Sequence, residues 1–172
     1  TTDQCKNGEC KPGPKANCDD GNTCTVSKCD PKTGCRSFAG AGEVFCWGLN
    51  DEGQLGVGDK INKLKPVTLQ FSALSLALGH LHSCAVKPDG GVVCWGANDV
   101  GQLGNGKTAS PQLTPDEVDG LTGVTEVAAG AGHTCALTSA GNVVCWGENG
   151  DGQRGDSDKE MSTKPGDVVL TG

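Results

Sequence analysis

The feature that most constrains the fold is a segment that recurs three times. Its core is Cys-Trp-Gly, followed by an Asn, a Gly-Gln pair and a Gly, and it is centred on Trp47, Trp95 and Trp146. A second unit, Gly-x-x-His-[Ser/Thr]-Cys-Ala, precedes it twice, starting at Gly79 and Gly130. Such a period, about 50 residues with short β-prone runs between glycines, predicts the blades of an all-β propeller.

The two units together read G-x-x-H-[ST]-C-A-[LV], then V-V-C-W-G-x-N-x-x-G-Q-L-G. This pattern resembles the RCC1 (regulator of chromosome condensation) repeat over about 130 residues. The resemblance implies a β-propeller, normally of about seven blades, each a four-stranded antiparallel sheet. We therefore expect an all-β, partial RCC1-like propeller.

The expected strands fill about two and a half blades. In the last repeat they are 124–129, 133–138, 142–147 and a short outer strand at about 167–170; in the repeat before it they are 74–78, 82–87, 91–96 and about 117–118. Closed propellers have about 4–8 blades, so residues 36–172 form an open arc. Two interpretations stay open: the chain is a fragment of a longer propeller, or neighbouring copies complete it.

The hairpin turns of the two repeats decide which cysteines face each other. The turns 88–90 and 139–141 fit three-residue loops with glycine in the final left-handed position. This register places Cys84 opposite Cys94 and Cys135 opposite Cys145, within the distance range of a disulfide. We predict that each pair is a disulfide within one blade.

Residues 1–35 form a different kind of segment. They carry six cysteines among Asp, Asn, Gly, Lys, Thr and Pro, so cross-links must supply their order. The stretch C-x-D-G-N-x-C-T…C-D-P-x-T-G-C, from Cys18 to Cys35, resembles a cysteine-rich repeat of secreted bacterial proteins. We expect a small disulfide-rich module at 1–35 and the propeller repeats at 36–172. Calcium binding at Asp19, Asp20 and Asn22 is an alternative to simple turn formation by these residues.

The remaining cysteines allow two schemes. Cys35 and Cys46 face each other if the loop between them has even length, which leaves an odd number among Cys5, Cys10, Cys18, Cys24 and Cys29. Otherwise the first six cysteines pair among themselves and Cys46 is left over. Eleven cysteines leave one without a partner inside the chain.

Charge and cysteine content limit the partners and the compartment. The net charge is −7, without a basic stripe, which argues against binding to nucleic acid or to anionic lipid. No apolar run reaches the length of a membrane span. Eleven cysteines in 172 residues are typical of an oxidising compartment, so we expect an extracellular or cell-surface protein of the bacterial secreted type.

Residues that recur in every repeat are expected to be structural. His82 and His133 are expected to hydrogen-bond the backbone between strands, and the tryptophans to pack between blades. The asparagines and glutamines of the repeats are expected in turns and inter-blade hydrogen bonds; they are Asn50, Asn98, Asn149, Gln54, Gln102 and Gln153. His80 and His82 would share a strand face as a weak metal pair. The tripeptide Arg154-Gly155-Asp156, which binds integrins in some secreted proteins, is too short to carry a prediction.

No nucleophilic triad, phosphate loop or paired catalytic carboxylates can be recognised, so neither an enzyme nor a cofactor is predicted. We expect a non-catalytic extracellular protein-interaction or adhesion module that uses loops such as 59–65 and 107–115. The alternative is a structural subunit of an extracellular assembly or filament, joined to its copies through open blade edges.

Overall fold

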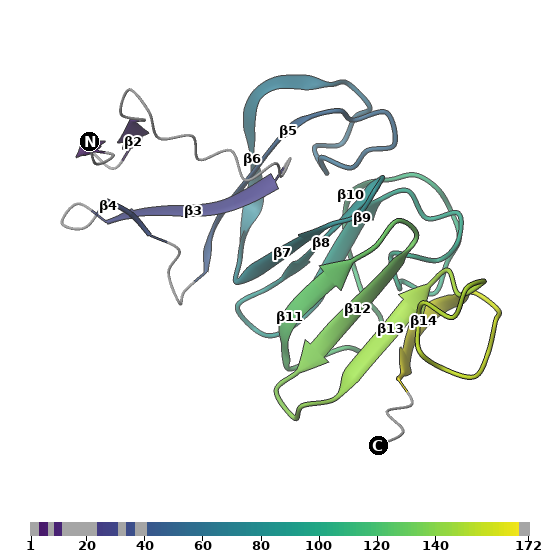
Figure 1. The fold of residues 1–172 in the computed structure, drawn as a ribbon. Helices are drawn as coiled ribbons and strands as arrows, with labels where there is room; N and C mark the ends of the chain where they lie inside the picture. The colour runs from purple at the N-terminus through teal and green to yellow at the C-terminus, as the bar shows by residue number, and fades with distance from the viewer. Residues whose placement is uncertain (1–3, 7–8, 12–23, 31–33, 37–40, 169–172) are drawn as a thin grey trace.

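The computed structural model describes residues 4–6, 9–11, 24–30, 34–36 and 41–168, with side chains from 41 onward (Figure 1). The described residues form an all-β protein of three four-stranded antiparallel sheets. No helix in these residues has the length and apolar character that crossing a membrane requires.

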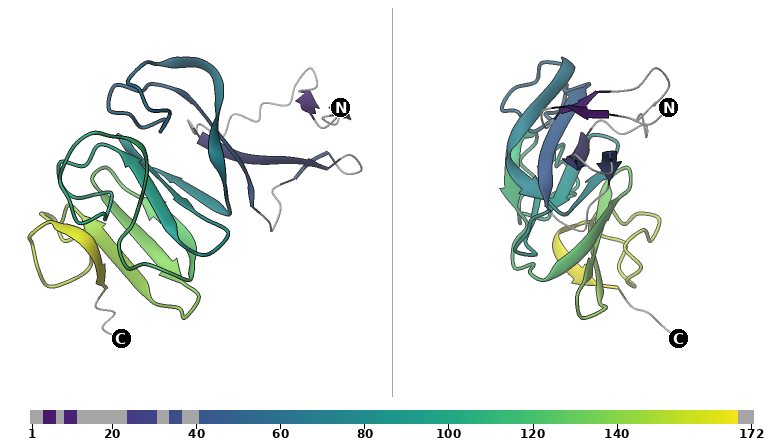
Figure 2. Two further views of the ribbon diagram at one scale, coloured as in Figure 1. Left: turned by 180° about the vertical axis from the view of Figure 1, so that it is seen from behind. Right: turned by 90° about the vertical axis from the view of Figure 1, so that its left-hand side faces the viewer.

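Each sheet is one blade. The first blade has the order β4 (Gly34–Arg36), β3 (Cys24–Asp30), β5 (Gly42–Gly48), β6 (Lys63–Ala73). The second has β7 (Ser75–Leu78), β8 (His82–Val86), β9 (Val92–Gly96), β10 (Gln112–Glu117), and the third has β11 (Val124–Ala129), β12 (His133–Thr138), β13 (Val143–Gly147), β14 (Ser162–Asp167). A separate two-stranded ribbon joins β1 (Gln4–Lys6) to β2 (Glu9–Lys11). Figure 2 shows the three sheets side by side in an open fan, with β3 and β4 projecting beyond it.

The predicted hairpin register of the second and third blades is confirmed. Gly90 and Gly141 have φ values of +81° and +85°, the left-handed conformation that closes a three-residue loop. Cys84 lies opposite Cys94 and Cys135 opposite Cys145. Both pairs form disulfides, each with a Cα–Cα distance of 4.1 Å.

The first blade differs from the sequence-based expectation of a half blade. The strand β3, from the cysteine-rich segment, pairs with β5 and thereby joins the segments 1–35 and 36–172 in one sheet. Its register places Cys24 opposite Cys46, the same blade position as Cys84 opposite Cys94. Cys46 itself takes part in a disulfide bond.

The register does not place Cys35 opposite Cys46, which was one of the two schemes that the sequence left open. The outer half of β3 pairs with β4, so Cys35 lies opposite Cys29. In the separate ribbon Cys5 lies opposite Cys10. Cys18 lies outside the described residues.

The outer strands begin earlier than predicted and are longer. We expected them at about 117–118 and 167–170, whereas β10 and β14 end near those points. Both contain a proline, Pro115 or Pro165, and β6 contains Pro66 at the corresponding position. An outermost strand tolerates proline because the missing N–H would face solvent.

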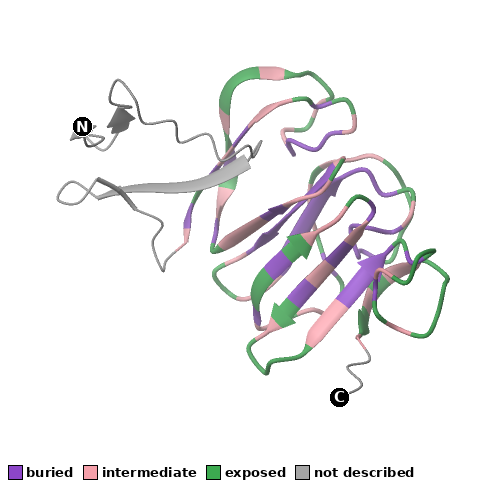
Figure 3. Ribbon diagram, in the orientation of Figure 1, coloured by how far each residue is buried: buried purple, intermediate pink, exposed green. Residues whose placement is uncertain are grey.

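The hydrophobic cores lie between blades. The core between the first and second blades includes Val44, Leu55, Val93 and Trp95. A second core, between the second and third blades, contains Leu103, Val127 and Trp146. Figure 3 shows the buried residues concentrated on the inner strands, in agreement with the complete burial of β8 and β9.

Candidate protein-interaction surface

One long loop in every blade connects the third strand to the fourth. These loops span 49–62, 97–111 and 148–161, and we call them the long loops. They lie at the same end of the fan, on the right in Figure 1. Their position at one end makes them neighbours on a single surface.

A buried asparagine fixes the conformation of each long loop. Asn50, Asn98 and Asn149 are 0–1 % exposed. Each accepts, through Oδ1, a hydrogen bond from the main-chain N–H five residues later, at 2.8–3.1 Å. Each donates, through Nδ2, to the main-chain carbonyl nine residues later. The amide side chain thus replaces backbone pairing that the loop lacks, and it holds the loop in one shape.

The glutamine of each repeat has two separate roles. Its side-chain Oε1 accepts a hydrogen bond from the main-chain N–H two residues earlier, which closes a turn in the loop. The main-chain carbonyls of Gln54 and Gln102 accept the indole N–H of Trp95 and Trp146 from the next blade, each at 2.8 Å. The structure therefore places these residues in turns and inter-blade bonds, as the sequence suggests.

The tryptophans lie between blades, although not all are equally buried. Trp95 and Trp146 are 0 % exposed, and Phe71 of the first blade contacts Trp95 edge-to-face with ring centroids 5.9 Å apart. Trp47, in the first blade, is only half-buried.

Large apolar side chains are exposed on and beside the long loops. Leu49 is 48 % exposed, Ile61 66 %, Leu64 97 % and Met161 48 %. Isolated exposed apolar residues are common, but a group of them at one end of a rigid scaffold is typical of a protein-binding surface. The predicted binding loop 59–65 contains Ile61 and Leu64, but the sequence analysis singled out none of these four side chains, because an apolar residue in a loop has no periodic pattern.

An apolar groove runs between the outer strands of the first two blades. It has a volume of about 420 Å³ and is lined by Val57, Val67, Leu69, Phe71 and Pro115, among others. It lies on the part of β6 that follows Leu64, so it continues the exposed apolar surface. The loop segments 59–65 and 107–115, which we expected to bind a partner, include the first residues of β6 and β10, which are strand.

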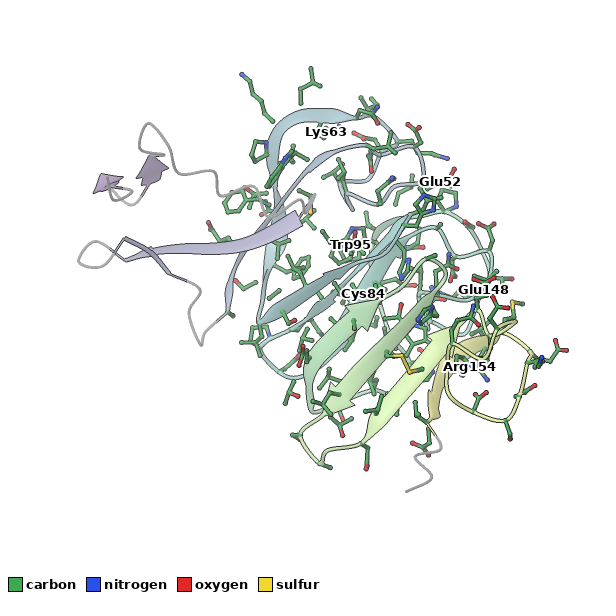
Figure 4. All side chains as sticks on the ribbon, viewed as in Figure 1. Glu52, Lys63, Cys84, Trp95, Glu148 and Arg154 are labelled. Carbon is green, nitrogen blue, oxygen red and sulfur yellow. A yellow bond between two sulfur atoms is a disulfide. The ribbon has the colours of Figure 1, made fainter. Side chains whose placement is uncertain are left out.

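Charged side chains surround the apolar residues of the first long loop. Lys60 pairs with Glu52 at 3.5 Å, and Lys63 pairs with Asp59 at 2.6 Å (Figure 4 labels Glu52 and Lys63). The hydrogen bond from Lys63 lowers the pKa of Asp59 below its usual value. The third long loop, in contrast, exposes the acidic side chains of Asp151, Asp158 and Glu160.

The histidines lie differently from the prediction. His82 is 1 % exposed, and its Nε2 lies 2.9 Å from the hydroxyl of Thr134 in the next blade, so its partner is a side chain and not the backbone. Burial, and to a smaller extent the charge of His133, lowers the pKa of His82 to about 4. His80 is exposed and precedes β8, so His80 and His82 do not share a strand face as predicted.

The Gly-x-x-His unit requires glycine at its first position because the histidine ring packs directly against it. A Cβ atom at Gly79 would lie 2.3 Å from the ring of His82, and one at Gly130 would lie 2.2 Å from the ring of His133. The imidazole therefore occupies the space that any other residue would fill.

The Arg-Gly-Asp tripeptide of the third long loop is folded back on itself. Arg154 is 7 % exposed, and its guanidinium binds the carboxylate of Asp156. The same carboxylate accepts a hydrogen bond from Asn149. Arg154 and Asp156 thus bind each other within the loop, although the buried Nε of Arg154 has no hydrogen-bond partner among the described residues.

Metal-binding predictions concern residues that the structure describes only in part. Asp19, Asp20 and Asn22, the calcium candidates, lie outside the described residues. In the described part of the chain, no three His, Cys, Asp or Glu side chains gather into a site that could hold a metal ion.

Comparison with known families yields a clear match. The model of the regulator of chromosome condensation (RCC1) repeat matches residues 41–86 and 89–137, and a second RCC1 repeat model matches 74–102 and 124–153. Each of the four matched segments includes one Cys-Trp-Gly segment and one Gly-x-x-His unit.

Several curated proteins are similar over most of the chain. Probable E3 ubiquitin-protein ligase HERC6 of Homo sapiens is 39 % identical over 65 % of the chain and 12 % of its own length. The X-linked retinitis pigmentosa GTPase regulator homolog of Caenorhabditis elegans is 38 % identical, over 70 % and 9 %. Ultraviolet-B receptor UVR8 of Arabidopsis thaliana is 31 % identical, over 73 % and 30 %. The chain therefore spans less than a third of these relatives.

Solved structures share the fold. Prp20p from Saccharomyces cerevisiae superposes with a TM-score of 0.68 and 24 % identity, over 76 % of this chain and 35 % of that one. Human WBSCR16 superposes with a TM-score of 0.66 and 24 % identity, over 74 % and 33 %. The three blades described above thus correspond to about a third of those structures.

Proposed function

The chain belongs to the RCC1 repeat family, and from this premise we propose that it is a non-catalytic extracellular protein-interaction module. Its partner is a protein, which it binds with the long loops and the adjoining apolar groove. It does not bind nucleic acid and does not insert into a membrane.

The observation that carries this proposal is the combination of rigid loops and exposed apolar side chains. Asn50 and Asn149 hold their loops from inside, while Ile61 and Met161 are 66 % and 48 % exposed on the same loops. A loop that is already ordered loses little conformational entropy when it binds, so its apolar side chains contribute more of their burial energy to affinity. The groove of about 420 Å³ offers a concave site for side chains of the partner.

The cysteines and the charge support the location and the exclusions. Disulfides persist in oxidising environments, and the chain has eleven cysteines, four of which form the two blade disulfides. A net charge of −7 disfavours the phosphate backbone of nucleic acids and anionic lipid head groups.

A non-catalytic role is supported by the position of the most perturbed titratable group. His82, with a pKa lowered to about 4, is sealed between two blades. A buried ring that hydrogen-bonds Thr134 stabilises the joint between blades and cannot reach a substrate.

The proposal can be tested by site-specific photo-crosslinking. The chain would carry a photoreactive amino acid at position 61 or, as the control, at position 137, where Leu137 is 38 % exposed outside the long loops. Both versions are incubated with the extracellular proteins of the source cells. A partner cross-linked only from position 61 is purified, and its affinity is measured by calorimetry for Ile61→Asp and Leu137→Asp.

We expect Ile61→Asp to weaken binding about tenfold or more and Leu137→Asp to leave it unchanged, because the loss of a buried side chain costs about 1.5–3 kcal/mol. Equal cross-linking from both positions, or equal affinity of both variants, would contradict a binding surface on the long loops.

A structural subunit of an extracellular assembly is a second candidate. It is favoured by Leu64 of the first blade, which is 97 % exposed, and by Gly152 of the third, where an added Cβ would meet no atom within 4 Å. The corresponding residues between blades inside the chain contact each other, since Leu113 lies against Gly53 and Thr163 against Gly101. Light scattering of the purified chain over a range of concentrations tests this candidate.

A further inference from the structure

We propose that the apolar groove beside β6 binds an extended peptide segment of the partner protein, which joins the first blade as an additional strand. The inference rests on the proposed function, since the groove adjoins the long loops, and it names the chemistry of the partner. The partner segment is uncharged, and its side chains alternate between apolar and polar. Both walls of the groove come from described residues, β6 of the first blade and Thr114 and Pro115 of β10.

The residues that line the groove show that it follows the edge of β6. Successive side chains of a strand point to opposite faces of its sheet, so a cavity above one face contacts every second residue. This groove contacts five consecutive residues, from Val67 to Phe71. It therefore runs along the outer edge of the strand, where main-chain N–H and C=O groups point outward.

No described strand pairs with this outer edge. β6 is the outermost strand of the first blade and pairs only with β5 (Figure 1). Among the described residues, no main-chain hydrogen bond joins residues 67–71 to the second blade. Pro115, on the opposite wall, has no N–H group of its own. A strand that enters the groove can thus pair with β6 on one side and pack against a proline on the other.

The edge of β6 lacks the residues that block the other two outer strands. After its proline, β10 continues with Asp116 and Glu117, and β14 ends on Asp167. β6 continues after Pro66 for residues 67–73 without a charge, a glycine or another proline. Proteins block sheet edges with charges and prolines because an open edge accepts a further strand. The first blade thus has an edge that can accept one.

Two valines make the groove apolar. In the second blade, Asn105 donates a hydrogen bond to Asp116 at 3.0 Å. Val57 corresponds to Asn105, since each follows a Gly-Gln-Leu-Gly segment, and Val67 corresponds to Asp116, since each lies opposite the cysteine of the third strand. An apolar pair thus replaces a hydrogen-bonded pair, and it favours a partner that buries apolar side chains.

An ion pair spans the corresponding place between the second and third blades. Lys164 pairs there with Asp119 at 3.5 Å. Asp119 and Gln70 each lie four residues after the proline of their outer strand, and Lys164 and Thr114 each lie one residue before it. Gln70 and Thr114 are uncharged and line the groove. The groove therefore depends on these side chains, and it lies between two blades that both have four described strands.

Charge and dimensions define the partner segment. None of the nine residues that line the groove is charged. The charged side chains that flank these segments already pair with each other: Lys107 with Asp116 at 3.5 Å, and Lys63 with Asp59 at 2.6 Å. A charged segment would lose hydration in the groove without meeting an unpaired counter-charge, so an uncharged segment is complementary to it. Five residues of strand extend about 17 Å, and every second side chain of the partner enters the groove.

Peptide display provides the probe. A library of random peptides, each about seven residues long, is displayed on phage and selected on the folded wild-type chain. The enriched peptide is synthesised with a fluorescent label, and its affinity is measured by fluorescence anisotropy. We expect the enriched sequences to be uncharged and to alternate apolar with polar residues, because an added strand turns one side toward the groove and the other toward solvent.

The substitution Thr68→Glu tests whether the peptide lies at the edge of β6. Thr68 is exposed on this edge, and Glu117 occupies the corresponding position of β10, so the blade accepts a glutamate there. Thr125→Glu, at an exposed position of β11, is the matched control. We expect Thr68→Glu to weaken peptide binding about tenfold or more, because the carboxylate loses hydration at a paired edge, and Thr125→Glu to leave it unchanged. Urea unfolding verifies that both variants are folded.

Methylation of single main-chain nitrogens in the peptide tests strand pairing. In an added strand every second N–H donates to β6, so methylation should weaken binding about tenfold at alternate positions and little at the positions between them. An effect without this alternation would mean that the peptide binds without joining the sheet, and would overturn the inference.

Three other results would also overturn it. They are the enrichment of no peptide, equal peptide binding by wild type and Thr68→Glu, and a wild-type dimer that Thr68→Glu dissociates. The last result would identify a second copy of the chain as the occupant of the edge. None of these results decides the proposed function, because the cross-link from position 61 tests that function separately.

Discussion

The indole of Trp95 donates its N–H to the main-chain carbonyl of Gln54 at 2.8 Å, which joins two blades through residues 41 positions apart. Trp146 and Gln102 repeat this relationship. A glycine two residues after each glutamine makes room for the ring: a Cβ at Gly56 or Gly104 would lie 2.8 or 2.7 Å from the indole nitrogen. The Gly-Gln-Leu-Gly segment is thus the binding site for the tryptophan of the following blade.

The first prediction concerns this glycine. Gly104→Ala should destabilise the chain by about 3 kcal/mol, of which about 1 kcal/mol comes from the left-handed backbone and the rest from overpacking against Trp146. Gly120→Ala is the control, because Gly120 has the same φ of +69° but an added Cβ there would meet no atom within 4 Å. Urea unfolding followed by tryptophan fluorescence measures both. A difference between the two variants below about 0.5 kcal/mol would contradict a tight fit of the indole.

The second prediction concerns pH. Burial lowers the pKa of His82 to about 4, so the folded state disfavours the charged ring that the unfolded chain accepts near pH 6.5. Between these two pH values the unfolded state binds more protons, and the free energy of unfolding therefore rises with pH. The contribution is complete above about pH 6.5 and amounts to about 3 kcal/mol at most.

Urea unfolding at pH 4.5, 5.5, 6.5 and 7.5 measures this dependence. His82→Gln should flatten it, whereas His80→Gln, at an exposed position, should leave it as in wild type. A wild-type slope that persists in His82→Gln would assign the dependence to other groups.

Local turn chemistry was enough to predict much of the fold. The glycines at 90 and 141 fix a three-residue turn, and the turn fixes the register of every residue on the two strands beside it. Both blade disulfides could be predicted for this reason. The position of the tryptophans between blades followed from their recurrence, although recurrence alone does not indicate which carbonyl accepts each indole.

Longer-range features were not predictable in the same way. Cys24 and Cys46 are 22 positions apart instead of 10, because β4 and its turns are inserted between them. The segment Cys24-Thr25-Val26 does resemble Cys84-Ala85-Val86, and this was the available signal. The outer strands were predicted too far along the chain, after their prolines. A proline argues against a strand unless the strand is known to lie at the edge of a sheet. Whether Leu64 is exposed depends on which blade packs beside it, and the local sequence pattern does not contain this information.

The third prediction concerns the buried asparagine that fixes the conformation of each long loop. Asn98→Ala should destabilise the chain by about 2–3 kcal/mol, because it leaves the N–H of Leu103 and the carbonyl of Lys107 without their buried partner. The loop 97–111 should then be cut sooner by proteases. Asn142→Ala is the control, since that exposed side chain makes no hydrogen bond in the described part of the chain. Unfolding and limited proteolysis are the measurements, and equal behaviour of the two variants would show that the loop is ordered by other contacts.

The last prediction concerns the disulfides of the first blade. In the second and third blades, cysteines that face each other across the central strand pair are bonded. Because Cys24 faces Cys46 and Cys29 faces Cys35 in the same way, we expect these two bonds. Trypsin digestion under non-reducing conditions places these four cysteines on four different peptides, since trypsin cuts after Lys28, Lys32 and Arg36.

Mass spectrometry of the digest distinguishes the two schemes. We expect the peptide 29–32 linked to 33–36, and the peptide 16–28 linked to 37–60, with fragmentation of the linked pair placing the bond at Cys24 and not at Cys18, which lies on the same peptide. A link between 33–36 and 37–60 would instead join Cys35 to Cys46, and would mean that β3 does not hold the register of a blade strand. The bond from Cys24 therefore decides whether the cysteine-rich segment is part of the first blade, because it is the covalent counterpart of the ladder between β3 and β5.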